Sequence, residues 1–418
     1  MIKYLLLDQS KSIFSLELSK MISYQLESWG DSSPLSTESP ALWDALSAAI
    51  NQLQGIVWND PRISDEMTRA EGVRYLTRLI AGAIPMTMES WNPEFPSFFT
   101  FLSSRIQYGL PAADALYQWA PIHGDYVYRI KGRRGTAHMM DIETRQGHFA
   151  HIGGWALFDR CSEFECDADG NIEIVLSKNE QPGNWVKIPD GLGDLIFRQY
   201  FYDWVNEEPA QLQISRDGAR YPAPIVSPHL IAQRTRLLID WLHNLPAFFA
   251  EQVQSYYQDE INTVRIDEVS IGWAELRYGK ANYECELDEA LIIEVVPPEA
   301  KYWSIQLYSQ FWDARDWNLR QTSINGFQAV LGEDGVFRAV ISHEDPGVIN
   351  WLDAANHRTG LLSLRYFRAK TAPLPTIRRV KLSELPSIIN DRKLLITSDQ
   401  RSELLRRRAE SVVRRNCL

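Results

Sequence analysis

The chain has 418 residues, of which 45% are hydrophobic and 23% charged, as in ordinary globular proteins. This length exceeds what one hydrophobic core usually holds, so we expect two or three compact units. The formal net charge of -11 argues against a broad nucleic-acid surface, because phosphate binding needs clustered Lys and Arg.

Cysteine usage and the first residues indicate the compartment. The cysteines are scattered in a pattern that fits neither a disulfide framework nor paired zinc knuckles: Cys161, Cys166, Cys285 and Cys417. The apolar run from Met1 to Leu7 ends at Asp8 and is too short for a signal peptide or a membrane span. We therefore expect reduced thiols in a cytoplasmic protein that does not bind membranes.

Residues 1–120 are predicted to form a helical region. Ser39-Pro40 is a helix-start signal, because Ser can accept from free backbone N–H groups and Pro fixes φ in the first turn. A second helix is expected from Ser64. Two predicted core faces follow at helical spacing: Leu42, Leu46, Ile50, Leu53 and Val57, then Met67, Ala70, Val73, Leu76 and Ile80.

The apolar period changes to two near Tyr126, which predicts a first β unit over residues 121–222. Residues 223–260 read as linking helices that begin at Ser227-Pro228, with Pro246 as a kink or break. A second β unit is expected over residues 261–375.

Residues 376–418 are predicted to be an irregular tail closed by a helix. Thr397 and Gln400 fit a capping box at its start. Its apolar residues Leu405, Ala409 and Val412 should dock on the body. The arginines of this helix are expected to face water or a partner: Arg406, Arg407, Arg408, Arg414 and Arg415.

The two β units carry an internal repeat. Asp169-Gly170 is followed by a strand ending at Ser177, and Asp334-Gly335 by a strand ending at Ser342, with six residues between Gly and Ser in both. A Pro-Gly pair, an Asn-Trp pair and an Arg follow in the same order: Asn184-Trp185 and Arg198, then Asn350-Trp351 and Arg365. The matched spacing predicts a duplicated module with each Asp-Gly in an equivalent hairpin.

Short strands with turn signals and segregated helices predict an α+β protein. It would contain two tandem antiparallel β-sandwich units, jelly-roll-like, with an N-terminal helical region and a C-terminal helix.

The chain also resembles the bacterial domain-of-unknown-function 1214 family and its sister family 1254. The resemblance is carried by Tyr302-Trp303, Asp334-Gly335, Asp345-Pro346-Gly347, Asn350-Trp351-Leu352-Asp353 and Arg365. It implies β-sandwich units with a helical portion and implies no activity. Relatives often show Asn-Pro-Asp followed by a Tyr, where this chain has Ala112-Ala113-Asp114 and Tyr117.

Polar residues gather in the second copy of the repeat, within sixteen positions of the sequence. We interpret this cluster as one wall of a cleft between the two β units, facing Tyr117 and His123. His343 or His357 would be the general base, because His titrates near neutral pH. Asp345 would orient that base. Asn350, Trp351, Arg358 and Arg365 would contact substrate, with an Arg holding an anionic or oxygen-rich group.

Aromatic residues are numerous, and Trp303 and Trp312 fall in the densest run, so they are expected to contact a bulky apolar or ring-shaped ligand. A sandwich core is an equally good reading of this run. No metal ligand set is identified: His148 and His151 would point to opposite faces of a strand, and His343 with Asp345 leaves a third ligand unidentified.

The sequence contains no Gly-x-Ser-x-Gly motif and no nucleotide-binding glycine pattern. A paired-carboxylate glycosidase stays open, because its two acids need only meet in space. We expect an enzyme of unnamed reaction, hydrolase- or lyase-like, acting on a small or medium organic substrate without an organic cofactor. The alternative is a non-catalytic ligand-binding or scaffold protein, and a homo-oligomer is open in either case.

Overall fold

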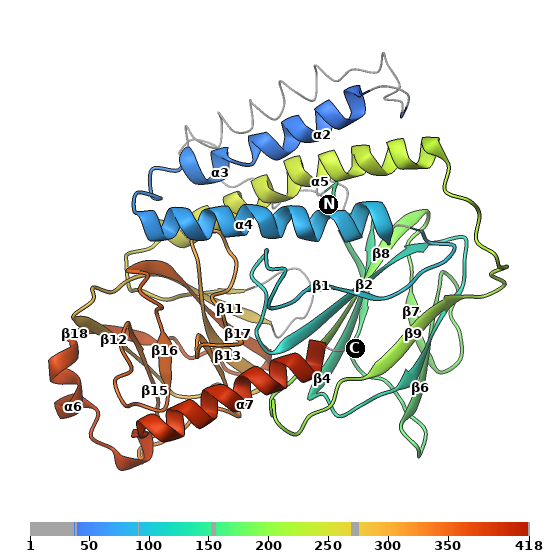
Figure 1. Cartoon of the computed structure of the whole chain (residues 1–418). Coiled ribbons are helices and arrows are strands. Elements are labelled where there is room, and N and C mark those ends of the chain that lie inside the picture. The colour runs from blue at the N-terminus through green and yellow to red at the C-terminus, as the bar shows by residue number, and fades with distance from the viewer. Residues whose placement is uncertain (1–36, 38–39, 91, 152–155, 269–275, 417–418) are drawn as a thin grey trace.

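The computed structural model describes residues 37, 40–90, 92–151, 156–268 and 276–416, and in these ranges the chain forms two β halves beneath a layer of helices (Figure 1). The sequence features at Met1–Leu7, Ser39 and Cys417 lie outside the described residues. The fold is α+β, as predicted.

The helical layer contains α2 (Ala41–Gln52), α3 (Gly55–Trp58), α4 (Glu66–Ile84), the π-helix η1 (Pro85–Glu89), the long α5 (Pro228–Gln254) and the short η3 (Ser255–Gln258). Figure 1 shows α2, α4 and α5 lying side by side across both halves. Ser227 caps α5 by accepting from the Leu230 N–H at 3.2 Å, as its Ser-Pro signal predicts. Pro246 does not end the helix, which continues to Gln254.

The predicted core face of α4 was right only in its second half, where Leu76 and Ile80 pack partly buried against the core. Met67 and Val73 are exposed, and the buried stripe instead runs through Thr68, Gly72 and Tyr75 toward Gly82. A Cβ on Gly72 would lie 2.7 Å from the Val57 side chain. Because glycine has no Cβ, Val57 can approach this face of the helix closely. The helix is capped by Asp65, not by Ser64.

The described residues of the first half form nine strands in two sheets. One sheet has the order β1-β2-β8-β4-β5 and the other β7-β6-β3-β9. Their bounds are β1 (Phe99–Leu102), β2 (Ala115–His123), β3 (Tyr128–Arg133), β4 (Met139–Gln146), β5 (Ala156–Cys161), β6 (Asn171–Ser177), β7 (Asn184–Lys187), β8 (Leu192–Tyr200) and β9 (Gln211–Arg216).

The second half repeats this topology with every strand number raised by nine: its sheets have the orders β10-β11-β17-β13-β14 and β16-β15-β12-β18. The predicted duplication is therefore confirmed. The bounds are β10 (Arg265–Glu268), β11 (Arg277–Glu284), β12 (Glu289–Val295), β13 (Ala300–Tyr308), β14 (Ser323–Asn325), β15 (Phe337–Ser342), β16 (Trp351–Asp353), β17 (Thr359–Ala369) and β18 (Thr376–Lys381).

Two details differ from the predicted antiparallel sandwiches. The pairs β6–β7 and β15–β16 are parallel, because each Pro-Gly loop leads the chain back along the strand it has just left. The Asp-Gly pairs do form equivalent tight turns, with φ of 78° at Gly170 and 75° at Gly335. However, β5 and β6 belong to different sheets, and so do β14 and β15, so neither turn joins two paired strands.

The repeated Asn-Trp pair has a structural role that the two halves share. Asn184 bonds the backbone N–H and C=O of Glu165, and Asn350 bonds those of Val330. The indole N–H of each following Trp donates at 3.2 Å to the carbonyl of the Ser that ends the neighbouring strand. The motif therefore fixes the parallel strand pair in both halves.

After β18 come η4 (Leu382–Glu384), α6 (Leu385–Ile388), η5 (Arg392–Leu394) and α7 (Ser398–Asn416). The capping box at Thr397 and Gln400 is confirmed, with reciprocal bonds of 2.9 and 3.3 Å. The helix docks through Val412, as predicted, but Leu405 and Ala409 are only partly buried. The rest of the docking face is formed by Arg401, Arg408 and Arg415, which are two turns apart and buried.

These arginines stack on aromatic rings and donate to the body. The Arg408 and Arg415 guanidinium groups lie 4.1 and 4.2 Å from the ring of Trp204. Burial lowers the pKa of Arg408 to about 9 and that of Arg415 to about 10, while nearby Asp114 opposes the shift. The expectation that both face water is therefore corrected.

The two five-stranded sheets of the described structure meet between the halves. One core cluster lies within each half, between its own sheets. Tyr200 of the first half contacts Tyr302 and Phe367 of the second, with ring centroids 5.4 and 5.3 Å apart. We call this contact between the halves the seam.

Candidate functional site

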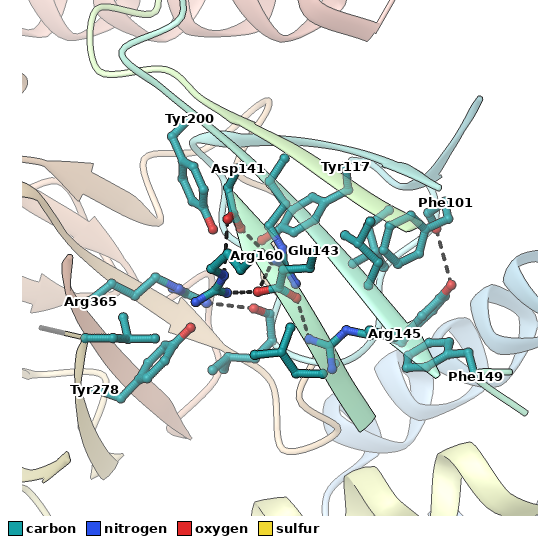
Figure 2. A pocket seen from close by; sticks show the side chains of 18 of the residues that line it. Phe101, Tyr117, Asp141, Glu143, Arg145, Phe149, Arg160, Tyr200, Tyr278 and Arg365 are labelled. Atoms are coloured by element: carbon teal, nitrogen blue, oxygen red, sulfur yellow. Dashed lines mark hydrogen bonds and ion pairs between the residues drawn. The ribbon is translucent and has the colours of Figure 1, made fainter. Parts of the chain in front are cut away.

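A cavity of about 290 Å³ opens in the seam (Figure 2). We call it the seam pocket. Both halves and helix α5 line it: Phe101, Leu102, Tyr108, Gly109, Leu110, Tyr117, Met139, Asp141, Glu143, Arg145, Phe149, Leu157, Arg160, Ile196, Arg198, Tyr200, Phe248, Phe249, Leu276, Tyr278, Trp312, Arg365 and Phe367.

The floor of the pocket is the charged face of the first half. Strand β4 alternates, so Met140 and Ile142 enter the core between its sheets, while Asp141, Glu143 and Arg145 point into the seam. Arg198 on β8 and Arg160 on β5 come from the two strands that flank β4 and join this row.

The floor charges are bonded to one another. Arg198 donates to Asp141 at 2.9 Å and lies 2.7 Å from Glu143. Arg160 contacts both carboxylates, at 3.2 Å from Asp141, and Arg145 donates to Glu143. Burial and the neighbouring Arg198 lower the pKa of Arg145 to about 10, whereas Asp194 and Asp141 oppose that shift.

Counting formal charges shows that the floor is balanced. Three guanidinium groups, on Arg145, Arg160 and Arg198, face the carboxylates of Asp141 and Glu143. The third carboxylate is Asp194, the cross-strand neighbour of Arg145 on β8. The floor therefore brings three positive and three negative charges together and needs no outside ion.

Arg365 on β17, in the opposite wall, differs from the floor arginines. Its side chain is 2% exposed, and its two bonded partners are neutral oxygens: the Tyr308 hydroxyl and the Leu110 carbonyl, both at 2.6 Å. Among the described residues no carboxylate forms an ion pair with it. Burial alone lowers the pKa of Arg365, but four surrounding tyrosines, Tyr308 foremost, hold it well above its ordinary value. Arg365 is therefore a buried, permanently charged cation beside a cavity.

Residues 109–113 precede β2 and bond to Gln306, Tyr308 and Arg365 of the second half, and Gly109 and Leu110 line the pocket. We call these residues the covering segment. Leu110 and Trp312 both have left-handed backbones, with φ of 59° and 66°, and the Leu110 N–H donates to the Trp312 carbonyl at 2.8 Å. Such conformations cost non-glycine residues about 1 to 3 kcal/mol and often mark functional sites. One residue of this strained pair, Leu110, supplies the carbonyl that accepts a hydrogen bond from Arg365.

Three residues predicted to contact ligand do line the seam pocket: Arg365, Tyr117 and Trp312. Tyr117 accepts from the Ala112 N–H at 2.9 Å, and burial raises the pKa of its hydroxyl despite the nearby Arg365. These three residues therefore lie together between the β units, whereas most of the predicted set does not. What these residues bind remains a prediction.

The other predicted site residues lie away from the seam pocket. Asp345 forms an ion pair with Arg401 at 3.0 Å and so holds α7. Asn350 and Trp351 fix the strand pair described above. Trp303 packs in the core of the second half, against Phe337.

The predicted base residues are buried in the second half, outside the pocket. His343 shares a hydrogen bond of 2.9 Å with the Cys285 carbonyl. Burial and the charge of Arg315 lower the pKa of His357 to about 3, so its ring is neutral at physiological pH. Arg358 is exposed and pairs with Glu286, while His123 lies at the last residue of β2, outside the lining.

The sequence reasoning missed the charged floor. A signal was present, because Asp141, Glu143 and Arg145 alternate with Met140, Ile142 and Thr144. Charged residues at every second position of a strand that otherwise faces a core indicate a second, polar interface. The same alternation of side chains along β8 would have placed Arg198 on the face that holds Asp141, Glu143 and Arg145.

Within the described residues, no group of three or more His, Cys, Asp or Glu could hold a metal ion. None of the described helices is long and apolar enough to cross a bilayer. The described cysteines Cys161, Cys166 and Cys285 are free thiols.

Comparisons with known proteins give a fold but no activity. The chain is 28% identical to an uncharacterized protein from Burkholderia cenocepacia whose crystal structure is known; the TM-score is 0.76, and the match covers 88% of this chain and 99% of that one. A protein from Vibrio parahaemolyticus is 11% identical, with a TM-score of 0.44 over 73% of this chain and 98% of that one.

No curated protein matches the chain. A family described as protein of unknown function, DUF1214, matches residues 120–202 and 278–371, one segment in each half. These segments hold β8 with Arg198 and β17 with Arg365, and so carry both walls of the seam pocket. The chain belongs to the DUF1214 family.

Proposed function

We propose that the protein binds a small organic anion with an apolar or ring-shaped body in the seam pocket. The ligand would place its single negative charge against Arg365 and its body against the apolar wall. Such a pocket, largely apolar with a few convergent polar groups, is typical of small-molecule sites.

The observation that carries this proposal is the buried charge of Arg365. A buried cation bonded only to neutral oxygens lacks the counter-charge that normally offsets its desolvation. The floor arginines have their own carboxylates, so within the described ranges the excess of one positive charge falls on Arg365. A carboxylate can accept two parallel N–H bonds from a guanidinium, which makes it the natural partner.

Binding is better supported than catalysis. The described lining contains no His, Ser or Cys, and its two carboxylates, Asp141 and Glu143, already accept from arginines. The hydrolase- or lyase-like reaction expected from the sequence would need a free base, and no lining residue is placed as one. A purely structural seam is less well supported, because its walls enclose a cavity.

The test uses acid and amide pairs of equal shape: octanoate with octanamide, and 2-naphthoate with 2-naphthamide. Isothermal titration calorimetry should show each acid binding about 10- to 100-fold more tightly than its amide, since a hydrogen bond to a charged group contributes roughly 1.5 to 3 kcal/mol. Equal binding of acids and amides would refute the role of charge.

Arg365→Gln should remove the difference between acid and amide, and Arg365→Lys should retain part of it. Arg358→Ala is the matched control, because Arg358 lies on the same half but is exposed and paired with Glu286. If Arg365→Gln does not fold, the lysine variant still tests the charge. An unchanged acid preference in folded Arg365→Gln would place the anion elsewhere.

A further inference from the structure

The walls of the seam pocket have two chemically different ends. Figure 2 shows Arg365 and Tyr278 at one end, with Phe101 and Phe149 at the other, beyond Arg145. The second end is completed by helix α5 through Phe248 and Phe249. A ligand anchored at Arg365 would therefore extend toward a group of aromatic rings.

These rings are set at angles to one another. Phe249 lies 6.5 Å from Phe149 and 5.7 Å from Trp312, with interplanar angles of 58° and 55°. Phe101 meets Tyr117 edge-on at 6.0 Å. Rings in this arrangement can contact the face or the edge of an aromatic ring in the ligand. Each such contact would stabilise a bound aromatic ring more than a bound saturated ring.

The strand register gives the length between the two ends. Asp141 pairs with Arg198, and Arg145 pairs with Asp194, so the floor extends over five residues of β4, which are four residue steps. At about 3.3 Å per residue this is roughly 13 Å.

On these grounds, and resting on the proposed anion site, we infer that the ligand is an elongated aromatic monocarboxylate. Its carboxylate would meet Arg365, and its distal ring, about 10 Å away, would sit among Phe101, Phe149 and Phe249. One excess positive charge favours a carboxylate over a phosphate monoester, which carries close to two negative charges. The cavity of about 290 Å³ suits two linked rings.

The probes are biphenyl-4-carboxylate, its saturated counterpart bicyclohexyl-4-carboxylate, benzoate and decanoate, each titrated calorimetrically into the full chain. We expect the biphenyl acid to bind about tenfold more tightly than the bicyclohexyl acid, as two or so aromatic contacts allow. Benzoate should be weaker than the biphenyl acid, because it is too short to reach the distal rings.

Phe249→Leu should reduce the preference for the biphenyl over the bicyclohexyl acid while leaving both acids bound. Phe149→Leu gives a second variant in case the first does not fold. Phe327→Leu is the control, because Phe327 is 60% exposed and does not line the seam pocket.

The outcomes separate this inference from the proposed function. If bicyclohexyl-4-carboxylate or decanoate binds as tightly as the biphenyl acid, or if octanoate binds and the biphenyl acid does not, the aromatic inference is overturned and the anion site stands. Biphenyl-4-carboxamide is titrated as the neutral counterpart of the biphenyl acid. If this amide binds as tightly as the acid, the anion site itself fails.

Discussion

On β4 of the first half the side chains that face the seam are Asp141, Glu143 and Arg145, whereas the equivalent positions of β13 hold Ser304, Gln306 and Tyr308. The register defines this equivalence. Asp141 lies opposite Arg198, and Ser304 lies opposite Arg365. Tyr117 and Tyr278 flank these two arginines in the same way.

The two rows satisfy their polar groups by different means. Gln306 and Tyr308 bond the backbone of the covering segment, at Ala113 and Pro111, and Arg365 bonds Leu110. The charged row of the first half bonds within itself. The two copies thus share a topology but differ in interior chemistry, and in the part of the chain that the structure describes this difference leaves Arg365 beside the cavity without a carboxylate.

Breaking the charged row should have the largest effect on stability. Glu143→Gln removes a buried negative charge shared by Arg145, Arg160 and Arg198. Removing one partner of a buried ion pair costs about 3 to 5 kcal/mol. Gln306→Ala, at the equivalent neutral position, should cost only about 1 to 3 kcal/mol.

Urea denaturation of the two variants measures the comparison. A loss for Glu143→Gln no larger than that for Gln306→Ala would mean that the floor charges are not a coupled buried network.

The repeated tryptophans sharpen the comparison in the same assay. Trp351 is 7% exposed and packed beneath the Arg401 guanidinium, whereas Trp185 is half-buried. Trp351→Ala should cost about 3 to 5 kcal/mol, and Trp185→Ala roughly half of that, because less apolar area is lost. Equal losses would show that the shared indole hydrogen bond, and not burial, sets the contribution.

Two buried histidines should make stability depend on pH. Burial is the main cause that lowers the pKa of both His148 and His357 to about 3. Between pH 3 and 6.5 the unfolded chain binds these protons and the folded chain does not. Each histidine therefore makes the free energy of unfolding fall by about 1.4 kcal/mol per pH unit as the pH drops below 6.5, with no loss above it.

Urea melts from pH 4 to 7 measure that slope. His148→Gln and His357→Gln should each flatten it, whatever their effect at pH 7, and exposed His229→Gln should not. An unchanged slope in both variants would show that the two rings take up protons in the folded state.

The sequence predicted the architecture well because its signals were local or repeated. Asp-Gly turns, the Ser227 cap and the Thr397 capping box depend on neighbouring residues, and the duplication is written in matched spacings. The seam was harder to predict. Residues of β4 and β8 face residues of β17 across it, and this arrangement depends on how two separate halves pack.

Polar density in the sequence was a poor guide to the site. The cluster from His343 to Arg358 is dense because it joins a parallel strand pair, the α7 anchor and a surface loop. The polar residues around the pocket are spread from Tyr117 to Arg365, so no single stretch of sequence stands out. Spacing along one chain therefore identified the repeat but not the wall that the two copies build together.

The smallest expected effect is that of Arg358→Ala, seven residues before Arg365. Arg358 is more than half exposed and pairs with Glu286 at 3.0 Å, and exposed pairs contribute about 0 to 1 kcal/mol. We expect a stability change below about 0.5 kcal/mol and unchanged binding of 2-naphthoate, since the ligand charge would meet Arg365 and not the surface. Weakened 2-naphthoate binding in a stable Arg358→Ala protein would move the anion site to the His343–Arg358 loop, where sequence density alone had placed it.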